Sequence, residues 1–114
     1  MLVSKKTQDR YAAAKQAERE AQARYTNAVM APCYYVEWGV ITEDEYERDA
    51  KRIARETGYT DAQKTLRKAE DAVLAELMQN AKRYGLPAED AETLKGHSTY
   101  RAYRARMLQI GLAN

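Results

Sequence analysis

The sequence predicts an all-α protein, and three observations support this fold class. Long stretches without Gly or Pro carry apolar residues at three- and four-residue steps, which is typical of helices with one buried face. Four of the five glycines lie between these stretches and the fifth follows the last one, where they are suited to end helices. Only one segment resembles a strand, so it has no second strand to pair with. We expect a single helical domain, residues 1–114, built as a small bundle of three main helices (about 4–30, 42–57 and 60–84) plus one or two short C-terminal helices (about 87–95 and 98–110).

The first predicted helix, 4–30, has a narrow face made mostly of alanine. Its small and aromatic residues recur at helical spacing: Tyr11, Ala14, Ala21, Tyr25 and Ala28. Each alanine contributes little buried area, so this helix needs a neighbour that supplies bulk. Two arrangements stay open, namely packing within the chain and pairing with a second copy through the alanine seam.

The segment 31–41 is the most hydrophobic part of the chain, and we expect Pro32 to separate it from the first helix. We interpret it as a single helical turn with Pro32 near its start and Gly39 at its end. It either closes one end of the bundle as a lid or exposes Tyr34, Tyr35 and Trp38 as an anchor for a partner, because Trp and Tyr dominate binding hot spots. We expect Trp38 to be mainly buried, and Tyr34 or Tyr35 to be exposed.

The second predicted helix, 42–57, begins with the T-x-x-E capping box of Thr42 and Glu45. Acidic residues in its first turns suit the positive end of the helix dipole. Three of these acids, together with the aromatic residues of 31–41, form the candidate partner-binding surface: Tyr34, Tyr35, Trp38, Glu43, Asp44 and Glu47.

The third predicted helix, 60–84, carries the most complete core face. We expect Gly58 to end the preceding helix and Thr60 or Asp61 to cap this one. The face consists of Leu66, Ala69, Val73, Leu77, Ala81 and Tyr84, and Leu74 and Met78 widen it. We therefore expect the other helices to pack against this one.

The C-terminal region is basic, because no acid follows Glu92. Cations beside tyrosines are typical of surfaces that bind nucleic-acid phosphates and bases. The candidate residues are Lys95, Tyr100, Arg101, Tyr103, Arg104 and Arg106. The competing interpretation is that the arginines pair with acids of a neighbouring helix, such as Glu43 or Glu47.

Composition argues against several classes of function. The net charge is +2, with 19 basic and 17 acidic residues, far from the excess of a dedicated nucleic-acid binder. One cysteine, Cys33, and one histidine, His97, provide neither a disulfide framework nor a His/Cys metal site. We expect no catalytic residues, metal, cofactor or small-molecule substrate, no membrane span, and a cytoplasmic location.

The chain has nine tyrosines and no phenylalanine, and hydroxyl-bearing rings suit interfaces. We therefore expect a non-enzymatic protein-binding module, in the manner of a small bacterial or phage accessory protein that acts stoichiometrically on a host complex, for example as an inhibitor of a defence system. The alternatives are a nucleic-acid-associated protein using its basic C-terminal helix, and a structural homo-oligomer assembled through the first helix.

Overall fold

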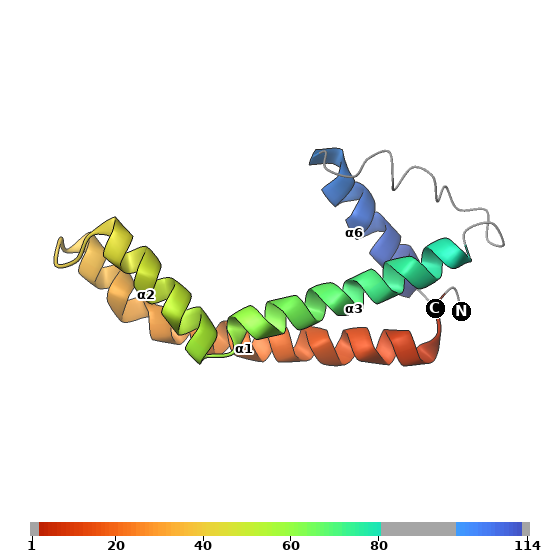
Figure 1. Ribbon diagram of the computed structural model, residues 1–114, viewed down its shortest axis with the longest axis horizontal. Coiled ribbons are helices and arrows are strands. Elements are labelled where there is room, and N and C mark those ends of the chain that lie inside the picture. The colour runs from red at the N-terminus through yellow and green to blue at the C-terminus, as the bar shows by residue number, and fades with distance from the viewer. Residues whose placement is uncertain (1–2, 81–97, 113–114) are drawn as a thin grey trace. The chain divides into compact units, whose positions relative to one another are not determined.

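A computed structural model of the chain describes residues 3–80 and 98–112. They contain four helices, α1 (Lys5–Glu37), α2 (Glu43–Glu56), α3 (Tyr59–Gln79) and α6 (Ser98–Leu112), as Figure 1 shows. All regular structure in these two ranges is helical, which confirms the predicted fold class. The short helix predicted at 87–95 and the last predicted turn of the third helix, 81–84, lie outside the described residues.

The chain forms two compact units. Unit 1 comprises Met1–Ala13 and Arg67–Asn114, and unit 2 comprises Ala14–Leu66. Helices α1 and α3 each contribute residues to both units. The single domain expected for residues 1–114 stays a prediction.

Helix α1 does not end at Pro32, so the boundary predicted near residue 30 is wrong. The helix runs through Pro32 to Glu37, and the segment 31–41 is not a separate turn. An internal proline removes one backbone hydrogen bond and crowds the preceding turn, at a cost of about 3 kcal/mol. Tyr46 of α2 is half-buried, and after burial the charges of Cys33 and Tyr25 on α1 also raise its pKa, so α2 faces this part of α1.

Gly39 provides the actual stop signal. Its φ of +75° is the left-handed conformation that favours glycine. The N–H of Gly39 donates to the carbonyl of Val36 at 3.1 Å, and that of Val40 donates to the carbonyl of Tyr35 at 2.8 Å. This pair of bonds is the Schellman motif, which satisfies the last carbonyls of a helix.

The capping box predicted for α2 is confirmed. The Thr42 hydroxyl accepts a hydrogen bond from the Glu45 backbone N–H at 3.1 Å, and the Glu45 carboxylate accepts one from the Thr42 N–H at 3.3 Å. At the other end, Thr57 is the C-cap and Gly58 follows with φ +78°. The Thr42–Glu45 capping box satisfies backbone N–H donors at the start of α2 that the helix itself leaves without acceptors.

In unit 2 the alanine face of α1 packs within the chain. Ala14 and Ala21 are 6% and 1% exposed, and Ile53 of α2 is also buried. The rings of Tyr25 and Tyr59 stack with centroids 4.9 Å apart, and the Arg24 side chain donates to the Thr57 carbonyl at the end of α2. Ala14 and Ala21 of the predicted seam are therefore covered within a single chain, whereas Ala28 of the same predicted face is exposed.

Helix α3 begins earlier than predicted. The Gly58 carbonyl accepts from the Ala62 N–H at 2.9 Å, so Thr60 and Asp61 lie in the first turn instead of capping it. Asp61 still places negative charge at the positive end of the helix. The predicted core face is confirmed where it is described, since Leu66, Ala69, Val73 and Leu77 are all buried.

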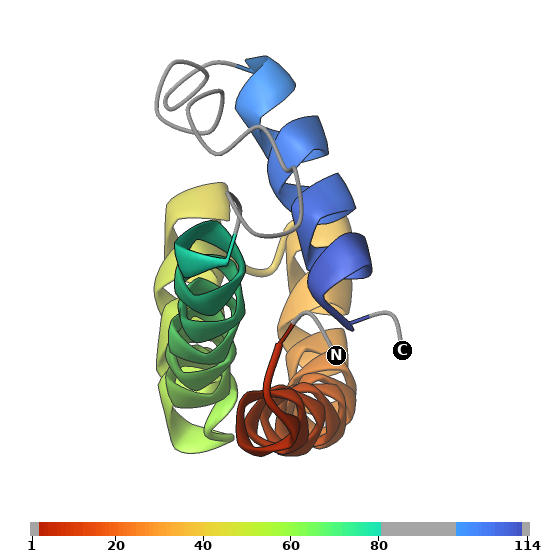
Figure 2. The ribbon, with the colours of Figure 1, turned by 90° about the vertical axis from the view of Figure 1, so that its right-hand side faces the viewer.

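The core of unit 1 joins Val3, which precedes α1, to residues of α3 and α6. Figure 2 shows the start of α1 and the last turn of α6 close to each other. Val3, Val73, Leu77 and Met107 are each at most 3% exposed. Gly111 of α6 lies against them, and a Cβ added there would be 3.0 Å from Val73 and 3.2 Å from Val3. The absence of a side chain at Gly111 therefore allows the close approach of α6.

Glu76 of α3 binds the start of α1 within unit 1. Its carboxylate accepts hydrogen bonds from the Thr7 hydroxyl at 2.6 Å, the Ser4 N–H at 2.5 Å and the Ser4 hydroxyl at 3.2 Å. The Thr7 hydroxyl and the Ser4 N–H are the main causes that hold the pKa of Glu76 below its ordinary value of 4.5. A carboxylate at this place also complements the positive end of the α1 dipole.

This arrangement predicts an acid-sensitive contribution to stability. Because the folded pKa of Glu76 is lowered, its contribution is present in full above pH 4.5 and is lost as the pH falls through the folded value. We expect Glu76→Gln to lower the free energy of unfolding at pH 7, and this difference from the wild type to shrink towards pH 3. Urea melts between pH 3 and 7 would measure it, with Glu20→Gln at an exposed position of α1 as control. A difference that stays constant with pH would contradict the assignment.

Candidate functional site

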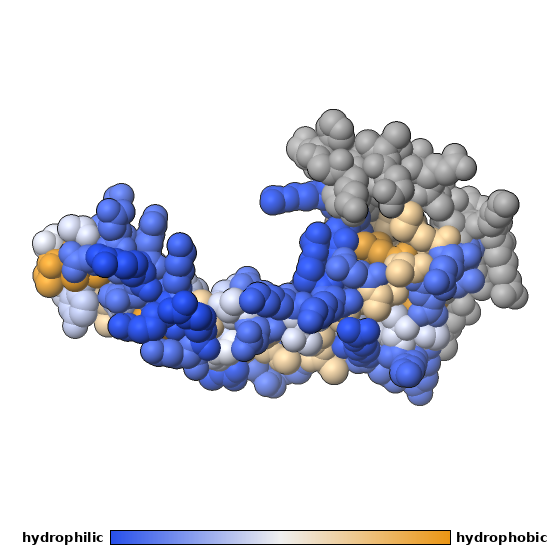
Figure 3. Space-filling model, in the orientation of Figure 1, coloured by the Kyte–Doolittle hydropathy of each residue, from blue (hydrophilic) through white to orange (hydrophobic). Residues whose placement is uncertain are grey.

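The end of α1 carries an exposed cluster of large side chains, which we name the aromatic patch: Tyr34, Tyr35, Trp38 and Val40. Their exposed fractions are 46%, 45%, 68% and 67%, and Met30, one turn before Tyr34, is 48% exposed. Figure 3 shows hydrophobic surface at the connection between α1 and α2, beside the hydrophilic surface of α2. Large apolar side chains gathered on a surface are typical of interaction sites.

Helical geometry brings the three rings together. Tyr34 and Trp38 are four residues apart, and Tyr35 and Trp38 are three apart, so all lie on one side of the last turn. The Tyr34 and Trp38 rings stack with centroids 5.6 Å apart, and Tyr35 meets Trp38 edge-on at 6.5 Å. The Schellman motif fixes the backbone beneath them, so the patch rests on regular structure and not on a loose loop.

The expectation that Trp38 is mainly buried is wrong, because it is the most exposed of the large hydrophobic residues that are described. The prediction failed because Pro32 does not end the helix. Continued helix carries residues 34–38 along the axis of α1, towards the end of the α1–α2 pair, and does not fold them back over a bundle. Tyr34 and Tyr35 are both exposed, which agrees with the expectation that at least one of these two rings is exposed.

The acidic candidates lie next to this patch, at the start of α2. Glu43, Asp44 and Glu47 are exposed, and none of them forms an ion pair with another described residue. Glu45 differs from them, because its carboxylate is used in the capping box. The structure thus brings the two halves of the predicted partner-binding surface to the same end of unit 2.

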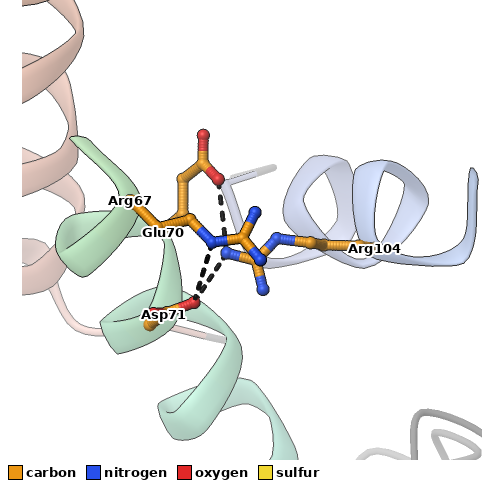
Figure 4. A network of polar contacts seen from close by, with 4 residues as sticks. All are labelled: Arg67, Glu70, Asp71 and Arg104. Carbon is orange, nitrogen blue, oxygen red and sulfur yellow. Dashed lines mark hydrogen bonds and ion pairs between the residues drawn. The ribbon is translucent and has the colours of Figure 1, made fainter. Parts of the chain in front are cut away.

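Arg104 of the basic candidates has an internal role. Its side chain is 10% exposed, and its Nη2 lies 2.6 Å from Asp71 Oδ1 and 3.3 Å from Glu70 Oε2, both on α3 (Figure 4). Arg67 also approaches Asp71, at 3.9 Å. The interpretation that an arginine pairs with a neighbouring helix fits Arg104, although its partners are Glu70 and Asp71 instead of Glu43 or Glu47.

The remaining basic candidates are not brought together by the described structure. Arg101 and Arg106 are exposed on α6. Lys95 lies outside the described residues, as do the side chains of Tyr100 and Tyr103. Arg104 is used in the protein interior, and the phosphate-binding surface expected from the other candidates stays a prediction.

The described ranges offer few groups for other chemistry. Residues 3–80 and 98–112 contain no group of three or more His, Cys, Asp or Glu side chains placed to hold a metal ion. Cys33 is a free, exposed thiol on α1. None of the described helices combines the length and apolar character that crossing a bilayer requires.

Sequence reasoning missed Met30, Val40 and Gly111 as residues of functional or structural interest. The signal for Met30 was its four-residue spacing from Tyr34, which becomes visible once the helix is continued through Pro32. Val40 lies beyond the helix end, after Gly39, so helical spacing does not indicate its exposure. No local signal marks Gly111, since its role depends on contact with Val3 and Val73.

Comparison with known proteins does not assign this site to a family, because no family model, no curated protein and no solved structure matches the chain.

Proposed function

We propose that this protein is a non-enzymatic protein-binding module whose anchor is the aromatic patch. The observation that carries the proposal is the exposure of Trp38, 68%, at the centre of two ring contacts with Tyr34 and Tyr35. Tryptophan and tyrosine are the residues most enriched in binding hot spots. A partner that covers the patch would remove these rings from water and gain about 25 cal/mol for each Å² of apolar surface.

The anchor is preorganised, which supports the same function. The stacked rings limit the side-chain freedom of Tyr34 and Trp38 before any partner arrives. The helix below them ends in a defined cap with Gly39 at φ +75°. Rings that are ordered in advance lose less conformational entropy on binding, so more of the contact energy contributes to affinity.

A cytoplasmic role is part of this proposal. Cys33 is free and exposed on α1, and such a thiol persists in a reducing compartment. The protein would act stoichiometrically, by occupying a surface of its partner.

The test separates folding from binding. We expect Trp38→Ala to change the free energy of unfolding by less than about 1.5 kcal/mol, since little more than the ring contacts is lost. The same change should weaken partner binding by about 2 kcal/mol or more, roughly 30-fold in Kd. Affinity capture from a lysate of the organism that encodes the protein, followed by titration of the captured partner, would measure the second effect.

Tyr25→Ala is the matched control. Tyr25 is a half-buried ring that stacks on Tyr59 away from the patch. Tyr25→Ala should lower the free energy of unfolding more than Trp38→Ala does. It should leave partner affinity unchanged at temperatures where the variant is folded. A large loss of stability in Trp38→Ala, or equal partner affinity in Trp38→Ala and wild type, would refute the proposed anchor.

A further inference from the structure

The charges of the chain are segregated around the aromatic patch. Between Thr26 and Glu47 there are five acids, Glu37, Glu43, Asp44, Glu45 and Glu47, and no Lys, Arg or His. The rest of the chain holds all 19 basic residues and only 12 of the 17 acids. A protein with a net charge of +2 therefore has one segment that is strongly negative.

The local structure concentrates this negative charge beside the rings. Helix α1 ends here with its negative dipole end and has no basic residue in its last turn. The positive end of α2 begins nearby, and three acids in its first turn, Glu43, Asp44 and Glu45, outweigh it. Glu43, Asp44 and Glu47 are exposed at the start of α2 and form no ion pair with any other described residue. These carboxylates are thus open to a partner, while Glu43 and Asp44 also complement the positive end of α2.

The exposed ring faces suit the same kind of partner. Tyr34 stacks on Trp38, yet Trp38 remains 68% exposed, which leaves ring surface open. A guanidinium group stacks on an aromatic face, and the ring quadrupole attracts the cation. Indole is the best ring for this interaction.

The negative charge around the aromatic patch disfavours other kinds of partner. Two copies of this end would bring like charges together, which opposes pairing through the patch. Nucleic acids and the anionic surface of a membrane are repelled for the same reason. A cationic protein surface gains from both the rings and the carboxylates.

We propose that the aromatic patch docks a basic protein segment, in which an apolar side chain packs on Tyr34, Tyr35 and Trp38 while flanking arginines reach the ring faces and the carboxylates of Glu43, Asp44 and Glu47. This proposal rests on the proposed function and names the chemistry of the partner. It also predicts that binding weakens as salt rises, because exposed charges are screened.

Selection from a displayed random-peptide library against the full chain tests the proposal, with Trp38→Ala as the counter-screen. We expect the peptides that require Trp38 to be rich in arginine around an apolar residue. Fluorescence anisotropy then compares the best peptide with a version in which citrulline replaces arginine, since citrulline keeps the shape and removes the charge. The citrulline version should bind at least tenfold more weakly.

Two triple variants of the protein test whether the position of the acids matters, because each removes three negative charges but from different places. Glu43→Gln with Asp44→Asn and Glu47→Gln should weaken the selected peptide at least tenfold and flatten its salt dependence. Asp9→Asn with Glu20→Gln and Glu56→Gln removes three exposed acids elsewhere and should change affinity less than twofold. A further variant, Glu37→Gln with Glu47→Gln, leaves the first turn of α2 intact and should weaken binding in the same direction as the first triple.

The outcomes distinguish this proposal from the proposed function. Trp38-dependent peptides that are neutral or acidic would overturn the basic partner and leave the protein-binding anchor in place. Equal loss of affinity in both triple variants would show a general charge effect and would also overturn it. Failure to select any peptide that depends on Trp38 would count against both.

Discussion

Replacing Leu77 by alanine is expected to lower the free energy of unfolding by about 2–5 kcal/mol. Leu77 is 0% exposed and belongs to the buried cluster with Val3, Val73 and Met107. The loss combines the transfer free energy of the deleted atoms with the cavity that remains, because neighbours relax only partly. Small domains are stable by about 5–15 kcal/mol, so this change removes a large share of the margin.

Leu77→Met is the control for Leu77→Ala, because it keeps volume and apolar character and should cost less than about 1.5 kcal/mol. Urea melts followed by circular dichroism would give both values. A loss below about 1 kcal/mol for Leu77→Ala would mean that the cluster around Leu77 does not hold unit 1 together.

Ala21→Glu is expected to destabilise unit 2 by about 3 kcal/mol or more, since it places a carboxylate at a buried site that holds a methyl group. Ala21 is 1% exposed on the face that α1 turns into the unit. The glutamate must displace its neighbours, reach water by bending the helix, or stay protonated. Each response reduces stability, and none yields the well-folded monomer that a seam between two copies would predict.

The exposed Ala17 and Ala23 of the same helix provide matched controls. Ala17→Glu and Ala23→Glu should each change the free energy of unfolding by less than about 0.5 kcal/mol. Thermal melts of the three variants under one buffer would compare them. A folded Ala21→Glu protein of unchanged stability and reduced mass in light scattering would restore the alternative of a homo-oligomer through α1.

Much of the fold was predictable because helix signals are local. The stripe with Ala14 and Ala21 packs inward, the Thr42–Glu45 cap forms, and Leu66, Val73 and Leu77 are buried as their spacing indicates. Each of these features depends on residues within two or three turns of one another. Hydrophobic periodicity and capping motifs are also patterns of residues within two or three helical turns, so the sequence alone indicates them.

The predictions that failed depend on contacts between distant residues. Pro32 is a strong stop signal by itself, yet α1 continues through it to Glu37 alongside α2. Whether Trp38 is exposed follows from that continuation, so the sequence left lid and anchor as open alternatives. Similarly, the partners of Arg104 lie 33 and 34 residues away on α3.

The candidate site was predicted in part. Its residues, Tyr34, Tyr35, Trp38, Glu43, Asp44 and Glu47, were singled out by residue type and by their places in the chain, and the structure places them at one end of unit 2. Their exposure and ring contacts required the three-dimensional arrangement.

The way that Ser4 and Val3 are held has a consequence for how the protein is made. Ser4 is bound by Glu76, 72 residues further along the chain, and Val3 packs against Met107 and Gly111. During synthesis, Val3 and Ser4 therefore cannot form these contacts until the ribosome has made the distant residues that they bind. Unit 2, residues 14–66, is contiguous, so its partners leave the ribosome together. The end of the unit that carries Trp38 has all its structural support available early, whereas the core around Leu77 stays incomplete until α6 has been translated.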